Sequence, residues 1–201
     1  MTQILLIISS PRQDSYSTQV ARKLADKLSS RPGSALVVRD LTHQPLPHID
    51  DSFAVARNTP ADHLTVSQKA ALVLSDKLLA ELFAADTVII AAGMINFGIP
   101  SSLKAYVDYV VRPGVTFRYG EQGPQGLVTG KKAYLVLARG GVYTQGPMQA
   151  LNFQDPYLKA ALGFIGVTDI EVIAIEGIAF GPDVAKKALA AALAKVDAIK
   201  L

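Results

Sequence analysis

A cluster of hydroxyl side chains follows the first apolar segment of the chain and has the chemistry to bind a phosphate group. Ser10, Ser15, Ser17 and Thr18 lie within nine residues, directly after the apolar run 4–8 and at the start of a segment with helical spacing. A helix N-terminus offers unpaired backbone N–H groups and the positive end of the helix dipole. The alternative is an ordinary helix cap, because serine and threonine are common N-caps. Four hydroxyls in so short a stretch favour the phosphate site.

The same segment lacks the patterns of the common nucleotide-binding loops. No G-x-G-x-x-G follows the first apolar run, and no G-x-x-x-x-G-K-[ST] occurs anywhere in the chain. A dinucleotide fold and P-loop phosphoryl transfer are therefore disfavoured. The first strand does not end in paired acidic residues, as a phospho-acceptor domain requires. We expect a phosphate that is held and not transferred.

Composition excludes several classes of function. The chain has 201 residues, half of them hydrophobic, no cysteine and a formal net charge of +3. The lack of cysteine excludes thiol redox chemistry and thiolate metal sites, and the histidines at 43, 48 and 63 lack metal-site spacing, so no metal is expected. The basic residues are scattered, which argues against nucleic-acid binding. No signal peptide or membrane span is apparent, so we expect a cytoplasmic protein of one domain, residues 1–201.

Strand-like and helical segments alternate along the chain. Strands are expected at 4–8, 35–38, 87–92, 133–138 and 169–175, and helices at 15–28, 65–85, 101–111, 156–165 and from 182 to about 200. This alternation predicts an α/β fold with a doubly wound, five-stranded parallel sheet in the order 2-1-3-4-5. Residues 41–60 are expected to form a loop. Residues 113–130 predict a hairpin inserted before the fourth strand, and we expect it near the carboxyl edge of the sheet, beside a substrate.

Two further unusual loops follow the third and fourth expected strands. Residues 93–100 combine flexible glycines with Met94, Asn96 and Phe97, and residues 139–143 contain the pair Gly140-Gly141. The carboxyl ends of parallel strands share one edge of a sheet, so these loops should meet the hydroxyl cluster. Individually each loop has an ordinary explanation, since glycine pairs often form tight turns and methionine or phenylalanine beside a strand is often core.

Together the three loops suit flavin mononucleotide (FMN). Its phosphate would lie at the first helix, and Met94 and Phe97 would flank the isoalloxazine ring. Asn96 and the loop backbones would hydrogen-bond the polar edge of the ring. N–H groups of Gly140 and Gly141 would stabilise the negative charge of the reduced form.

The chain resembles, nearly from end to end, the FMN-dependent NADH:azoreductase and quinone reductase family, whose members are flavodoxin-like. The most specific stretches are Pro113–Tyr119 with Gly123–Lys132, then 162–167 and 176–182. The resemblance implies a homodimer with one FMN per subunit. It places the cofactor contacts on Ser10, Ser15, Tyr16, Ser17, Met94, Ile95, Asn96, Phe97, Ala138, Arg139, Gly140 and Gly141.

Three positions depart from the family pattern. Gly93 and Ile95 replace residues of a frequent Pro-Met-Tyr-Asn-Phe sequence, and Ala138 stands where the family often has serine. Loss of the tyrosine ring changes the wall of the pocket and leaves substrate preference open.

The expected reaction is ping-pong hydride transfer from NADH or NADPH, through FMN, to a quinone or azo compound, with quinones as the better acceptors. Phe117, Tyr119 and Phe164 are candidates for lining the substrate space, Phe164 from either subunit. Alternatively, these aromatic residues pack the hairpin onto the sheet or a dimer interface. Two other functions stay open: a flavodoxin-like electron carrier that serves a protein partner, and a cofactor-free regulatory protein.

Overall fold

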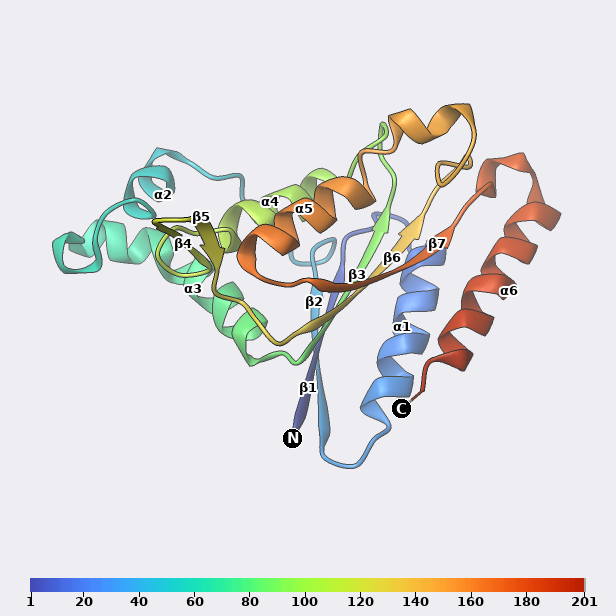
Figure 1. Ribbon diagram of the computed structural model, residues 1–201, viewed down its shortest axis with the longest axis horizontal. Coiled ribbons are helices and arrows are strands. Elements are labelled where there is room, and N and C mark those ends of the chain that lie inside the picture. Colours follow the sequence, from blue (N-terminus) through green and yellow to red (C-terminus); the bar gives the residue numbers. More distant parts are fainter. Residues whose placement is uncertain (201) are drawn as a thin grey trace.

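A parallel β-sheet with helices on both faces forms the centre of the computed structural model, which describes residues 1–200 (Figure 1). Its strand order is β2-β1-β3-β6-β7, which confirms the predicted order 2-1-3-4-5. The strands are β1 (Thr2–Ile8), β2 (Ser34–Asp40), β3 (Thr87–Gly93), β6 (Lys132–Ala138) and β7 (Asp169–Ile175).

Two hydrophobic cores lie on opposite faces of the sheet. Along β1, Leu5 and Ile7 belong to one core and Ile4, Leu6 and Ile8 to the other, as the two-residue period of a strand requires. The first core is covered by α2 (Asp51–Ala56), α3 (Val66–Ala84), α4 (Ser101–Val110) and α5 (Asp155–Ile165), and the second by α1 (Tyr16–Ser29) and α6 (Pro182–Ala198). Because both faces are buried, the central strands are apolar almost without interruption.

Local sequence signals set several helix ends. Helix α3 begins with a capping box in which the Thr65 hydroxyl accepts a hydrogen bond from the Gln68 N–H and the Gln68 side chain accepts one from the Thr65 N–H. Helix α6 begins at Pro182, whose missing N–H costs nothing in the first turn. Within residues 1–200, no helix has the length and apolar character needed to cross a membrane.

The segment 41–60, expected to be a loop, contains helix α2. Asp50 caps it by accepting a hydrogen bond from the Phe53 N–H at 2.8 Å. Phe53 is buried and packs on Tyr109 of α4, with 4.7 Å between the ring centroids. A helix of six residues is too short to be stable alone, so this tertiary contact, which periodicity does not reveal, stabilises it.

The inserted hairpin exists, but its expected place at the carboxyl edge is wrong. It consists of β4 (Phe117–Gly120) and β5 (Gly123–Gly126) and follows α4. Helix α4 returns the chain from the carboxyl end of β3 to the amino end of β6, so an insertion after it lies at the amino edge. Accordingly the Val128 N–H donates to the Ile165 carbonyl at 2.8 Å, beside the last residue of α5.

Candidate functional site

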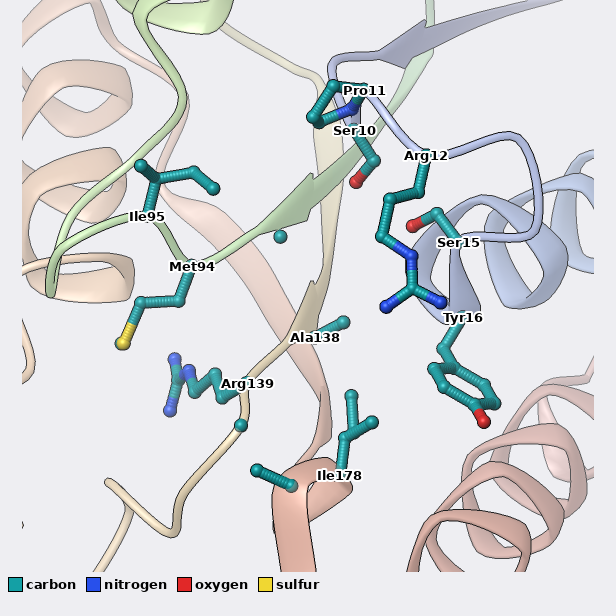
Figure 2. A pocket seen from close by; sticks show the side chains of 13 residues that line it. Ser10, Pro11, Arg12, Ser15, Tyr16, Met94, Ile95, Ala138, Arg139 and Ile178 are labelled. Atoms are coloured by element: carbon teal, nitrogen blue, oxygen red, sulfur yellow. The ribbon is translucent and has the colours of Figure 1, made fainter. Parts of the chain in front are cut away.

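A pocket of about 330 Å³ lies at the carboxyl edge of the sheet, where the loops after β1, β3 and β6 meet (Figure 2). This volume is in the range of small-molecule binding sites. In Figure 2, Ser10, Ser15 and Tyr16 lie on one side of it and Met94 and Ile95 on the other. The residues that line it are Ser10, Pro11, Arg12, Ser15, Tyr16, Gly93, Met94, Ile95, Ala138, Arg139, Gly140, Ile178 and Ala179.

Three serine hydroxyls form a hydrogen-bonded chain where β1 passes into α1. The Ser17 hydroxyl lies 2.8 Å from that of Ser10 and 2.9 Å from that of Ser15, and all three residues are buried. Ser15 occupies the N-cap position of α1, yet its side chain makes no capping bond. The hydroxyls thus lie around the N-terminus of α1 without accepting hydrogen bonds from its N–H groups.

The start of α1 has unused hydrogen-bonding capacity. No side chain caps its first-turn N–H groups, and among residues 1–200 the buried Thr18 hydroxyl has no partner. Free N–H groups at a helix N-terminus favour an anionic ligand, and Ser10, Ser15 and Tyr16 bring this N-terminus to the pocket, whereas Thr18 does not line it. These features fit the phosphate of FMN.

The loop after β3 forms a tight two-residue turn. Ile95 and Gly98 exchange backbone hydrogen bonds of 3.1 and 2.9 Å, and the residues between them, Asn96 and Phe97, have positive φ angles of 44° and 72°. Asparagine tolerates this left-handed region, whereas a phenylalanine there is strained. The turn is joined to the next strand because the Met94 N–H donates to the Ala138 carbonyl at 2.8 Å.

The loop after β6 directs its carbonyl groups toward the segment after β7. The carbonyls of Gly140 and Gly141 accept hydrogen bonds from the N–H groups of Ala179 (2.9 Å) and Gly177 (3.0 Å). Within residues 1–200, the N–H groups of the two glycines donate to no protein atom. Gly140 lines the pocket, so its N–H group faces no competing acceptor of the described chain there.

Arg139 differs from its expected role. Its side chain has no exposed surface, and its guanidinium is bound to Gln154, Asp155 and Glu176 at 3.0, 2.5 and 2.9 Å. Burial alone would raise the pKa of both carboxyl groups. Hydrogen bonds and the charge of Arg139 outweigh burial and lower both pKa values. Asp155 accepts hydrogen bonds from Asn152 and Lys159. Glu176 accepts them from the Thr144 hydroxyl and the Tyr143 N–H.

The predicted cofactor residues fall into two groups. Ser10, Ser15, Tyr16, Met94, Ile95, Ala138, Arg139 and Gly140 line the pocket, whereas Ser17, Asn96, Phe97 and Gly141 adjoin lining residues without lining it themselves. Sequence reasoning missed Pro11, Arg12, Gly93, Ile178 and Ala179 as lining residues. The last two follow β7, whose carboxyl end shares the same edge, and this placement was the signal that could have found them.

The aromatic residues proposed to line the substrate space lie away from the pocket of their own chain. Phe117 is buried against Phe164, with 4.5 Å between ring centroids, and Tyr119 contacts Phe117 edge-on at 5.6 Å. This cluster joins the hairpin to α5 at the amino edge. Within one chain, it therefore packs the hairpin and does not contribute to the pocket.

A second polar turn lies at the carboxyl end of β2. Asp40 accepts hydrogen bonds from the backbone and hydroxyl of Thr42 and from His43. Burial would raise the pKa of Asp40, but these hydrogen bonds outweigh it and lower the pKa to about 2. Asp40 does not line the pocket.

Fold and site together define a doubly wound α/β protein with a pocket at the carboxyl ends of its strands and an uncapped helix N-terminus beside it. Residues 2–199 match the protein family described as having a flavodoxin-like fold, and the chain belongs to this family. The match confirms the resemblance seen in the sequence.

Relatives and solved structures extend this assignment. The chain is 57% identical over 202 residues to FMN-dependent NADH:quinone oxidoreductase 1 of Rhizobium etli, covering 100% of this chain and 99% of that protein. It is 50% identical over 192 residues to the FMN-dependent NADH:quinone oxidoreductase of Herminiimonas arsenicoxydans, covering 94% of each. It is similar in structure to an azoreductase of Bacillus anthracis Sterne (TM-score 0.88, 31% identity, 98% and 97% covered). A second B. anthracis neighbour is an FMN-dependent NADH-azoreductase in complex with FMN (TM-score 0.85, 25% identity, 98% of each covered).

Proposed function

We propose that this protein is an FMN-dependent oxidoreductase that transfers electrons from NADH or NADPH to quinones and azo compounds. The observation that carries the proposal is the hydroxyl cradle, formed by Ser10, Ser15 and Ser17 at the uncapped N-terminus of α1, which opens into the pocket between the three loops. The names of relatives similar over their whole length point to the same activity.

Different segments of the pocket would hold the phosphate and the ring of FMN. Ser10, Ser15 and Ser17, with Tyr16 and the N-terminus of α1, would hold the phosphate. The ring would be held by the 94–97 and 138–141 segments, with unpaired N–H groups on Gly140 and Gly141. When bound, FMN would supply hydride acceptance from the nicotinamide and two-electron donation to the acceptor.

Donor and acceptor are proposed to bind in turn, in a ping-pong sequence. No protein nucleophile is needed, because FMN would accept the hydride and pass the electrons on. Initial-rate measurements at several fixed concentrations of quinone should give parallel double-reciprocal lines against NADH. Intersecting lines would contradict the ping-pong order.

A homodimer completes the proposal. The hairpin cluster lies away from the pocket of its own chain, so the exposed Tyr119 and the half-buried Phe164 are proposed to act on the pocket of the partner subunit, while the buried Phe117 supports them. Large apolar side chains next to the pocket loops, on Phe97, Met148 and Phe153, are exposed in the single chain and would be covered. The protein is further proposed to be one cytoplasmic domain, residues 1–201, where NADH and NADPH are available.

The visible spectrum of the purified protein tests the proposal. Added FMN should bind in about one equivalent per chain and lose its absorbance with NADH under anaerobic conditions. Benzoquinone and an azo dye should then each restore the absorbance, and steady-state turnover should need no partner protein. Flavin binding without such turnover would favour an electron carrier, and failure to bind FMN would favour a cofactor-free regulatory protein.

A further inference from the structure

A buried charge cluster underlies the loop after β6. Arg139 donates from Nε to the Gln154 side chain, from Nη1 to Glu176 and from Nη2 to Asp155, and none of its side-chain surface is exposed. A buried charge of this kind is strongly destabilising when one partner is removed. The three acceptors come from two separate segments of the chain, the start of α5 and the residue after β7.

The cluster also fixes the backbone of the pocket loop. Glu176 accepts a hydrogen bond from the Tyr143 N–H at 2.9 Å and one from the Thr144 hydroxyl. Gln154 reaches the carbonyl of Ala92, in β3. Both ends of the segment 139–144 are therefore tied to Glu176, and Gly140 and Gly141 lie between the two ties.

We propose that Arg139 is a positioning residue: its guanidinium, bound to Asp155 and Glu176, holds the Gly140-Gly141 segment at the pocket, and its side chain does not itself contact the ligand. The inference rests on the proposed FMN function. It refines the implication of the family resemblance that Arg139 is a cofactor contact, because the guanidinium is already engaged by three protein acceptors.

Geometry, and not charge, is the property that matters here. Asp155 and Glu176 oppose the charge of Arg139, and Lys159 lies 3.2 Å from Asp155, so the four formal charges cancel. A planar guanidinium reaches three acceptors in fixed directions, which a lysine ammonium on a flexible stem does not reproduce. Arg139→Lys therefore keeps the charge and removes the arrangement.

The experiment compares Arg139→Lys with Arg39→Lys. Arg39 is a matched control, because it is also buried, pairs with Glu81 and a glutamine, and lies outside the pocket. Arg139→Lys should weaken the binding of oxidised FMN about tenfold, which corresponds to the loss of one hydrogen bond. Reduced FMN carries more negative charge opposite the loop, so its affinity should fall about tenfold more than that of oxidised FMN. This difference lowers the two-electron midpoint potential of the bound FMN by about 30 mV. Arg39→Lys should change neither quantity per folded molecule.

Hydrogen exchange of the FMN-free protein provides a readout that is independent of cofactor binding. Arg139→Lys should speed exchange at the amides of Tyr143, Gly177 and Ala179, which donate to Glu176, Gly141 and Gly140, more than at the β1 core, and the control should not. If Arg139→Lys does not fold, Glu176→Gln serves instead, with faster exchange at Tyr143, whose N–H donates to Glu176, and the same direction of potential shift. Unchanged loop exchange, or an unchanged FMN affinity and potential, would overturn the positioning role. Failure of the wild type to bind FMN would instead refute the proposed function.

Discussion

The hydroxyl chain at the start of α1 makes a sharp prediction for Ser17→Ala. Ser17 is fully buried, and its hydroxyl is the only hydrogen-bond partner, within the described chain, of the Ser10 and Ser15 hydroxyls. The substitution removes this central hydroxyl and leaves the backbone N–H groups of α1 in place. It therefore tests the side-chain part of the cradle.

The cost to the free protein follows from the two lost hydrogen bonds. Each contributes about 0.5–1.5 kcal/mol to stability, which gives about 1–3 kcal/mol for both. Ser10 and Ser15 line the open pocket, so water can replace part of what they lose. We expect the free energy of unfolding to fall by about 1–2 kcal/mol.

The effect on FMN should be specific to its phosphate. A hydrogen bond to a charged group is worth about 1.5–3 kcal/mol. If the Ser10 or Ser15 hydroxyl loses its orientation, the affinity for FMN should therefore fall at least about tenfold. Riboflavin has no phosphate and should bind the variant and the wild type almost equally. The ratio of the two dissociation constants is thus the informative quantity.

Fluorescence titration of FMN and riboflavin, together with urea unfolding, measures both effects. Ser75→Ala is the control, because Ser75 is equally buried and its hydroxyl donates to the Tyr109 carbonyl at 2.7 Å, outside the pocket. The control should lose comparable stability and bind both flavins normally. Equal weakening of FMN and riboflavin by Ser17→Ala, or no weakening of FMN, would refute the assignment of the cradle.

Three further predictions concern stability. Asn96→Ala should lower the free energy of unfolding by about 1 kcal/mol while Asn96→Gly is nearly neutral, because φ is positive there; equal urea midpoints would contradict this. The folded pKa of Asp40 lies below its unfolded value, so its stabilisation of about 1–2 kcal/mol is present at neutral pH and lost as the pH falls from about 4 to 2. Asp40→Asn should therefore be less stable than the wild type at pH 7, and denaturant titrations should show the difference closing in acid. Gly126→Ala should cost about 1–3 kcal/mol, since its Cβ would overlap the backbone nitrogen of Gly166. Gly163→Ala has free space and lies within α5, so it should raise thermal stability instead.

Much of the fold and part of the site could be predicted because they depend on local patterns. Apolar runs such as 4–8 and 87–92 predict strands buried on both faces, and their alternation with amphipathic segments predicts the strand order. The hydroxyls at 10–18 predict the phosphate cradle because they sit at a strand-to-helix junction. Convergence of three loops follows from topology, since parallel strands end at one edge.

The rest depends on contacts between segments distant in sequence. Helix α2 is stabilised by Phe53 on Tyr109, and the hairpin lies at the amino edge because of the direction in which α4 returns the chain. The family resemblance implies that Arg139 is a cofactor contact. Only the tertiary structure brings Asp155 and Glu176 to its guanidinium, and because a buried charge must be matched by nearby opposite charge, those partners hold the guanidinium inside the protein.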